Sequence, residues 1–354
     1  MTTRHVPALD GLRGIAIFAV VMFHLRNSQW GIGWTGVDLF FVLSGFLIGG
    51  QLLDLERLDG AAVRGFYVRR AFRILPLYLL LLGAVVAARV AGNVEAGGAE
   101  PGWLLVTLMQ NAWYGTGGDG GYIQAATWSL AVEEHFYLLL PVALLLLRRR
   151  YVPVVCAAVI VAALAFRFAA FQAWEMPGVY YLTPSRIDGP MVGVLLAWCS
   201  RRFTIDVRLA GLVAGVGAGA IFVTVLVLGR LAVMASPWCY LATSAASAGI
   251  VVLATSPSWL SRQLGESRGL QWLGRRAYGV YLAHYGLIRG MEEGLGWPAA
   301  QKGAAPLIGA VLTLLLAELL WRTIEAPMIA LGRKMSVMST ADLKLSFRRF
   351  WRVA

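Results

Sequence analysis

An arginine and a histidine near the start of the chain are the first residues whose types and spacing could support chemistry. Arg13 and His24 lie in one apolar stretch, residues 9–24, and are eleven positions apart. On an α-helix this spacing is three turns plus about 20°, so both side chains lie on one face, about 16 Å apart along the axis. A charged or titratable side chain in a membrane span costs about 2.5 to 3.5 kcal/mol unless it faces protein or water. The pair therefore predicts a polar cavity along this helix. The spacing equally allows a topological anchor at Arg13 and an interfacial histidine at His24.

Three arginines that follow the second apolar segment form another candidate site. Arg69, Arg70 and Arg73 share one face of a helix because they are spaced by three and four residues. Each guanidinium can bind phosphate oxygens through two parallel hydrogen bonds, so the three together predict a phosphate site. Their charge alone is equally compatible with a topological role that also attracts anionic lipid.

Two acids lie well inside a later apolar segment, residues 126–147. Glu133 and Glu134 are followed by His135. Their insertion into a membrane would cost on the order of 5 kcal/mol or more without an internal partner. Ser129 and Glu133 share a helix face, whereas consecutive residues point about 100° apart, so the two acids cannot serve one site in the same way. We interpret the acids as functional, against the alternative of a structural polar cluster.

Further polar residues are distributed over other apolar segments. Asp38, near one end of the second segment, could cap a helix or fix the tautomer of His24, and we favour capping. Each of the others alone could join helices through hydrogen bonds, but together they supply polar groups to many spans, as a central cavity requires. These residues are Arg186, Asp188, Tyr278, Tyr281, His284, Glu318 and Glu325.

The elements that must position these residues are membrane spans. The chain has 354 residues, of which 58% are hydrophobic and 14% charged, and its mean hydropathy is +0.67, which is too apolar for a soluble domain. The predicted fold is all-α, a polytopic membrane protein with about ten transmembrane helices around a central polar cavity. One membrane domain, residues 1–335, precedes a basic amphipathic cytoplasmic tail, residues 336–354. The apolar segments of near-spanning length are residues 11–29, 36–53, 74–91, 126–147, 152–171, 186–200, 209–229, 237–255, 277–291 and 305–331.

The distribution of basic residues predicts the orientation. If the N-terminus is cytoplasmic, the inner loops are rich in arginine, whereas the outer loops hold little beyond Arg26, Arg230 and Lys302. The positive-inside rule therefore places both termini in the cytoplasm. The net charge of +12 is explained by this topology, and no nucleic-acid motif occurs. Three cysteines without a CxxC pair predict neither a disulfide framework nor a zinc site.

Several motifs together resemble the acyltransferase-3 family of membrane acyltransferases. The resemblance runs in the expected order from about residue 5 to residue 330, and it implies transfer of an acyl group, most often acetyl from cytoplasmic acetyl-CoA, to carbohydrate hydroxyls at or beyond the bacterial inner membrane. The family motif has glutamine or another polar residue where His135 stands, which leaves the role of His135 open. The matching features are the Arg13/His24 spacing, GVDLFFVLSGFLI, FYVRRAFRILPLY, WSLAVEEHFYLLLP, the Arg186/Asp188 pair, GVYLAH and IEAP.

The resemblance implies roles for individual residues. Arg13 and His24 are the signature catalytic pair, and Glu133 or Glu134 belongs to the essential site. We add Asp38 to the catalytic residues, as a group that could orient the imidazole of His24. The phosphates of CoA are held by Arg69, Arg70 and Arg73. The residues expected to bind substrate are Asp10, Ser129, Arg186, Asp188, Tyr281 and His284. No metal is required, membrane lipid is a further partner, and the oligomeric state stays open.

The mechanism that we hypothesise places acetyl-CoA along the stripe between Arg13 and His24. His24 acts as a general base or carries the acyl group transiently, and Glu133 or Asp38 orients its imidazole. Many family members add a secreted hydrolase-like domain; this chain is expected to be a stand-alone enzyme whose membrane domain recognises the acceptor.

Two alternatives remain. One is an acyltransferase for a small hydrophobic metabolite such as a macrolide. The other is a proton-coupled transporter, in which intramembrane acids and histidines relay protons. The arginine-rich cytoplasmic loop favours a CoA enzyme, because a proton-coupled carrier does not need it.

Overall fold

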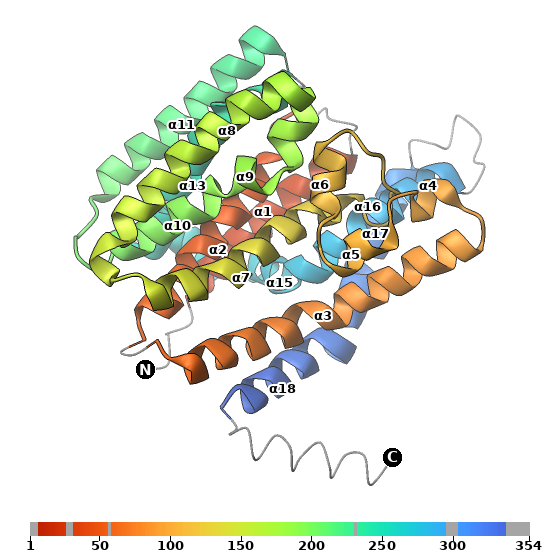
Figure 1. Cartoon of the computed structure of the whole chain (residues 1–354), viewed down its shortest axis with the longest axis horizontal. Helices are drawn as coiled ribbons and strands as arrows, with labels where there is room; N and C mark the ends of the chain where they lie inside the picture. Colours follow the sequence, from red (N-terminus) through yellow and green to blue (C-terminus); the bar gives the residue numbers. More distant parts are fainter. Residues whose placement is uncertain (1–5, 26–30, 56–57, 230–231, 295–303, 338–354) are drawn as a thin grey trace.

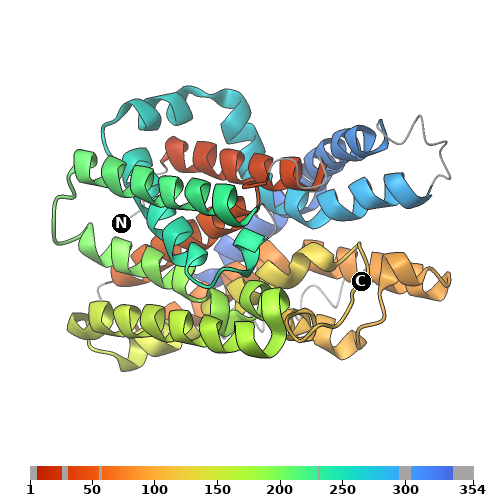
Figure 2. The ribbon, with the colours of Figure 1, turned by 90° about the horizontal axis from the view of Figure 1, so that it is seen from above.

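The computed structural model describes residues 6–25, 31–55, 58–229, 232–294 and 304–337, and every regular element in these residues is a helix. The long helices run across the molecule in similar or opposite directions and form a bundle (Figures 1 and 2). The prediction of an all-α polytopic membrane protein is confirmed. The predicted basic tail, residues 336–354, lies outside the described residues except for its first two positions.

The first half of the chain supplies most of the helices that carry candidate residues. It contains α1 (Pro7–Leu25), α2 (Thr35–Leu53), α3 (Gly60–Val90), α4 (Val94–Gly97), α5 (Gly102–Val106), α6 (Gln110–Gly115) and, after a single 3-10 turn (Ala125–Thr127), α7 (Trp128–Leu146). The second half contains α8 (Val152–Tyr181), α9 (Thr183–Arg186), α10 (Asp188–Cys199), α11 (Val207–Leu228), α12 (Ala232–Ala235), α13 (Cys239–Thr255), α14 (Trp259–Glu266), α15 (Arg268–Arg275), α16 (Ala277–Gly294), α17 (Ala305–Leu320) and α18 (Ala326–Ser336).

The number of membrane spans differs from the prediction. Within the described residues, seven helices are long and apolar enough to cross a membrane, and up to eight if the bent pair α13 and α14 forms one span. The predicted number of ten is therefore not confirmed. The segment 186–200 forms α9 and the 12-residue α10, which at 1.5 Å per residue is only about 18 Å long. The segment 277–291 forms part of α16, which is not among the seven helices and carries three charged residues, Arg289, Glu292 and Glu293, near its end.

Close helix contacts depend on glycine at two places that bear on the site. A Cβ atom on Gly45 in α2 would lie 2.0 Å from the carbonyl oxygen of Pro190 in α10. A Cβ atom on Gly274 in α15 would lie 1.8 Å from the carbonyl oxygen of Asp10 in α1. Neither position can hold a larger residue without moving a helix. Glycine thus lets α10 and α15 approach the two helices that begin the chain.

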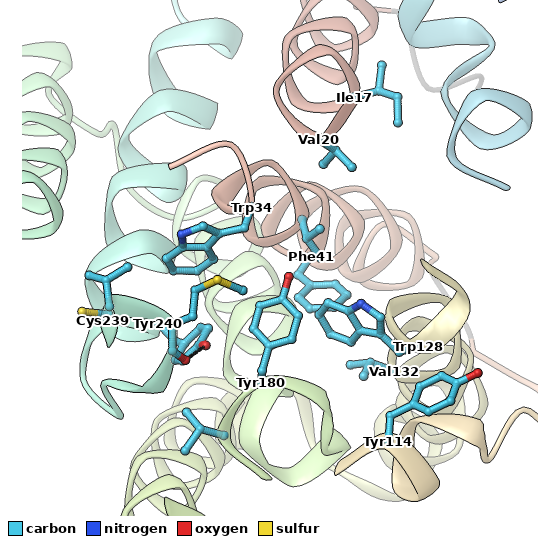
Figure 3. Close-up of a cluster of buried hydrophobic side chains, with 14 of the residues drawn as sticks. Ile17, Val20, Trp34, Phe41, Tyr114, Trp128, Val132, Tyr180, Cys239 and Tyr240 are labelled. Atoms are coloured by element: carbon cyan, nitrogen blue, oxygen red, sulfur yellow. Dashed lines mark hydrogen bonds between the residues drawn. The ribbon is translucent and has the colours of Figure 1, made fainter. Parts of the chain in front are cut away.

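A cluster of aromatic side chains forms one part of the core. The rings of Trp34, Trp128, Tyr180 and Tyr240 lie between α2, α7, α8 and α13 (Figure 3). On another side, α3 packs along α18, the last part of a continuous helical segment from Ala305 to Ser336 (Figure 1). The bundle between these two regions contains the polar cavity described next.

Candidate active site

Six of the predicted site residues line one cavity. The cavity lies between α1, α2, α3, α7, α15 and α16 and has a volume of about 100 Å³. The structure thus brings together side chains from all three thirds of the chain. The six predicted residues in its wall are Arg13, Arg70, Arg73, Ser129, Glu133 and Tyr281.

The positive charge in this cavity comes from Arg13, Arg70 and Arg73, which we call the arginine cluster. Arg13 forms an ion pair with Asp10 at 3.7 Å, the only ion pair that any of the three makes within the described part of the chain. The guanidinium of Arg70 lies 5.0 Å from the ring centre of Tyr137. The predicted cluster of three neighbours on α3 is therefore not the one observed. Arg69 does not line the cavity, because its side chain leaves α3 about 100° from that of Arg70.

Glu133 is the acid that faces the cavity. The hydroxyl of Ser44 donates a hydrogen bond to one of its oxygens, at 2.9 Å, and the hydroxyl of Tyr137 donates to the other, at 3.1 Å. Glu134 does not line the cavity, and its Oε1 is buried with no hydrogen-bond partner among the residues that the structure describes. The roughly 100° between consecutive helical residues separates the two acids as expected, and the structure places Glu133 with the arginine cluster.

His24 lies beyond the cavity and contacts a second histidine. Its Nδ1 is 2.9 Å from the carbonyl oxygen of Val20 and 3.2 Å from the Nε2 of His284. His284 is fully buried, and the ring centres of these two residues, which we call the histidine pair, are 5.0 Å apart. The stripe from Arg13 to His24 is therefore not the wall of a single cavity.

The predicted orientation of His24 by Asp38 or Glu133 is also corrected by these contacts. In the described residues His284 takes that place.

Tyr281 connects the cavity to the histidine pair. Its hydroxyl donates to the carbonyl oxygen of Ala126 at 2.7 Å and accepts a hydrogen bond from Ser129 at 2.6 Å. Its backbone carbonyl oxygen lies 2.7 Å from the Nδ1 of His284. One residue thus forms part of the cavity wall with its side chain and supports the buried histidine with its backbone.

Asp38, Arg186 and Asp188 lie in two buried ion pairs outside the cavity. Arg186 pairs with Asp38 at 2.7 Å, and Arg167 pairs with Asp188 at 2.9 Å, with at most 3% of any of these side chains exposed. The guanidinium of Arg186 lies 4.0 Å from the ring centre of Tyr240. The capping interpretation of Asp38 is wrong, because α2 has its N-cap at position 34 and Asp38 is inside the first turn. Both pairs instead join α2, α8, α9 and α10.

A buried polar network fixes the segment that leads into α7. Glu100 accepts a hydrogen bond from the hydroxyl of Tyr114 at 3.2 Å and lies 3.4 Å from the guanidinium of Arg89. Burial, and then the charge of Glu100, raises the pKa of the Tyr114 hydroxyl, which therefore stays a hydrogen-bond donor. Gln110 donates to the hydroxyl of Thr127 at 3.0 Å, one residue before α7 begins. These contacts set the position from which Ser129 reaches the cavity.

The sequence analysis did not single out Tyr137 and Ser44, which line the cavity, or Arg167, which holds a buried ion pair outside it. Tyr137 is four positions after Glu133, and this spacing on one helix face was a usable signal. Arg167 is an isolated arginine within the apolar segment 152–171, and its insertion cost was another. Ser44 carries no such signal, because a hydroxyl in an apolar helix is common and usually bonds to its own backbone.

Comparisons with known proteins identify relatives along almost the whole chain. Residues 6–322 match the family model described as an acyltransferase domain. Peptidoglycan O-acetyltransferase OatA of Listeria monocytogenes is 31% identical, with 92% of this chain and 56% of the relative covered. YrhL of Bacillus subtilis is 30% identical over 93% of this chain and 56% of the relative. O-acetyltransferase OatA of Staphylococcus aureus is 28% identical over 94% of this chain and 58% of the relative.

The chain spans somewhat more than half the length of these curated relatives. No solved structure was found that matches it.

Proposed function

This chain belongs to the family of acyltransferases whose domain it matches over residues 6–322, and on this premise we propose that it is a membrane O-acetyltransferase. The donor is acetyl-CoA, and the acceptor is a hydroxyl group of a carbohydrate. The relative from Listeria monocytogenes is named a peptidoglycan O-acetyltransferase, and a cell-wall glycan is the acceptor class that we propose for this chain.

The arginine cluster is the observation that carries the choice of donor. Three guanidiniums share a cavity wall with one carboxylate, that of Glu133, and only Arg13 has an ion pair within the described residues. Such an excess of positive charge in a confined space favours an anion, and guanidinium is suited to phosphate geometry. A volume of about 100 Å³ holds only part of a CoA molecule, so the cavity accommodates a phosphate or the acyl end, and the rest of the donor lies outside.

His24 supplies the proton transfer in this proposal. The acceptor hydroxyl oxygen attacks the thioester carbonyl carbon while the imidazole of His24 removes the hydroxyl proton. The carbon–sulfur bond then breaks, and the thiolate of CoA leaves and receives that proton from the imidazolium. The products are the acetyl ester and free CoA, and His24 returns to its neutral form.

The separation between the arginine cluster and His24 suits an extended donor. Arg13 and His24 are about 16 Å apart along α1, since eleven residues rise by 1.5 Å each. We infer that the flexible arm of CoA spans this distance past Ser129 and Tyr281. This arrangement places the phosphates at the end of the bundle where α1 begins, which we propose faces the cytoplasm of a bacterial inner membrane, with the acceptor on the other side.

The proposal is tested with the full chain in lipid nanodiscs. Acetyl-CoA carrying a labelled acetyl group is supplied with soluble glycan oligomers prepared from peptidoglycan. We expect ester-linked label in the glycan for the wild type and none for His24→Ala, because the imidazole is assigned to the proton transfer. Binding of CoA, measured by calorimetry, should remain within about threefold, since phosphate recognition is assigned to other residues.

The outcomes separate the parts of the proposal. Turnover by His24→Ala close to that of the wild type would remove the assignment of His24. Failure of CoA to bind the wild type would remove the donor. Binding of CoA without label in any glycan would remove the acceptor class and favour a hydroxyl on a small metabolite.

A further inference from the structure

The histidine pair carries an inference about which nitrogen of His24 reacts. We propose that His284 is a positioning residue that holds His24 in the tautomer with a proton on Nδ1, so that its Nε2 carries the reactive lone pair. This inference rests on the proposed function only for its kinetic consequence. The tautomer itself follows from contacts in the protein.

The hydrogen bond between His284 and the backbone of Tyr281 fixes the tautomer of His284. Its Nδ1 lies 2.7 Å from the backbone carbonyl oxygen of Tyr281. A carbonyl oxygen only accepts hydrogen bonds, so this nitrogen must carry the proton. In a neutral imidazole with a protonated Nδ1, the Nε2 holds a lone pair and acts as an acceptor. His284 is fully buried and bonded to its own helix, so α16 fixes the direction of this lone pair.

The two neighbours of the Nδ1 of His24 fix the tautomer of His24. Its Nδ1 lies 2.9 Å from the carbonyl oxygen of Val20 and 3.2 Å from the Nε2 of His284. Both neighbours are acceptors, so Nδ1 of His24 carries a proton that the two acceptors share. The other tautomer would direct the lone pair of Nδ1 at a carbonyl oxygen and at a second lone pair. The proton on Nδ1 leaves the Nε2 of His24 free to take a proton from the acceptor.

The histidine pair has a counterpart in the histidine and carboxylate of a catalytic triad. In a serine hydrolase a carboxylate accepts the Nδ1–H bond of the catalytic histidine and stabilises the imidazolium that forms. Here a neutral imidazole occupies that position. Among the described residues, the two acids considered for the role bond elsewhere, Asp38 to Arg186 and Glu133 to Ser44 and Tyr137. Support of His24 therefore comes from α16, which also supplies Tyr281 to the cavity wall.

The tautomer is measurable without any substrate. The chain contains four histidines, and we would record ¹⁵N spectra of the full chain with labelled histidine in nanodiscs. The signals of His24 are assigned by their loss in His24→Asn. We expect a protonated Nδ1 and an unprotonated Nε2 for His24, and a nitrogen–nitrogen correlation across the hydrogen bond to the Nε2 of His284. A protonated Nε2 with a bare Nδ1 on His24, or no such correlation, would overturn the inference.

Two amide variants of His284 test the kinetic consequence. The side-chain oxygen of glutamine can reach the position of Nε2 and accept the bond from His24, whereas asparagine is too short and can satisfy only the carbonyl of Tyr281. We expect His284→Asn to lower kcat roughly ten- to a hundredfold, the range known for loss of the residue that orients a metal-bound histidine, with little change in KM for acetyl-CoA. His284→Gln should restore most of the rate.

His135→Asn is the matched control. The Nδ1 of His135 bonds to the hydroxyl of Thr183 at 2.7 Å, so this histidine is held by a different contact. We expect its replacement to leave kcat within about threefold of the wild type. Equal losses in the Gln and Asn variants of His284 would contradict the positioning role. If the wild type shows no transfer at all, the proposed function fails while the spectra still decide the tautomer.

Discussion

The arginines on α1 and α3 differ in whether their charge faces the cavity. Arg70 and Arg73 face the cavity and make no ion pair within the described residues, whereas Arg13 has Asp10 at 3.7 Å. Among the described residues, Glu133 is the one carboxylate in the wall beside these three cations, so the cavity keeps an excess of positive charge that a bound anion can offset. Arg69 is the neighbour of Arg70 in sequence and does not line the cavity. Comparing variants of the arginines inside and outside the cavity wall therefore distinguishes binding of a ligand in the cavity from the overall positive charge of this part of the chain.

Arg73→Ala and Arg69→Ala form the corresponding test. A charge-assisted hydrogen bond contributes about 1.5 to 3 kcal/mol, which corresponds to a rise of roughly 10- to 150-fold in KM for acetyl-CoA in Arg73→Ala. KM for the glycan should change little, because only one substrate loses the contact. Arg69→Ala should stay within about threefold for both substrates. Similar effects of the two variants on KM for acetyl-CoA would contradict phosphate binding by the arginine cluster and would favour a role in membrane topology only.

The sequence identified most of the polar residues in the cavity wall but not their partners. Helical spacing predicted that Ser129 and Glu133 share a face, and both line the cavity. Spacing gives directions around one helix only, so it could not show that Arg13 joins Arg70 and Arg73 from another helix. The partner of His24 is 260 positions away, and nothing in the local pattern pairs two such histidines.

The close approach of α1 to α15 shapes one side of the cavity. Gly274 belongs to α15, lines the cavity, and meets the backbone of Asp10 without a side chain between them. Arg13 extends from the next turn of α1. The distance between these two helices therefore sets both the position of Arg13 and the width of the cavity.

Gly274→Ala is expected to separate α1 from α15. The new Cβ would lie 1.8 Å from the carbonyl oxygen of Asp10, so a helix must move. Overpacking of this kind costs about 1 to 3 kcal/mol. We expect a lower midpoint of thermal unfolding in detergent and a higher KM for acetyl-CoA.

Gly269→Ala in the same helix has nothing within 4 Å of its Cβ and is the control. It should unfold at the wild-type temperature or slightly above, because alanine favours helix by up to about 1 kcal/mol over glycine. An unchanged midpoint in Gly274→Ala would contradict the close approach of the two helices.

Hydrophobic patterning predicted the helices better than the spans. Within the described residues, each predicted apolar segment corresponds to helix, including 305–331, which lies within the continuous helical segment Ala305–Ser336. Burial of apolar residues along a helix does not reveal whether that helix crosses a bilayer. The short α10 is apolar because it packs against α2 inside the bundle, and this contact is not visible in its composition.

The distribution of charge in the loops predicts the orientation of the whole molecule in the membrane. Arginines concentrate at one end of the bundle, where α3 and α8 begin, and the connection that contains α4, α5 and α6 lies at the other end (Figure 1). The positive-inside rule predicts that the arginine-rich end faces the cytoplasm. Acetyl-CoA would then approach from the side where the arginine cluster lies.

Single cysteines at two exposed positions test this orientation. Asp119→Cys lies in the connection before α7, and Arg150→Cys lies just before α8, each in a background without Cys156, Cys199 and Cys239. In intact cells an impermeant thiol reagent should label only the cysteine at position 119, because the rule places it outside. Labelling at position 150 should require permeabilised cells. The reverse pattern would invert the molecule and place the arginine cluster on the outer side.

The ion pair between Asp38 and Arg186 also has a consequence for biogenesis. Its partners are 148 positions apart, so a ribosome that adds 5 to 20 residues per second needs roughly 7 to 30 s to make the intervening chain. During this interval the newly made α2 carries an acid whose basic partner has not yet been synthesised. Its stable insertion is therefore expected to be delayed until α9 and α10 emerge. Loss of Arg186 should therefore lower the amount of protein in the membrane more than it lowers the turnover of the protein that is inserted.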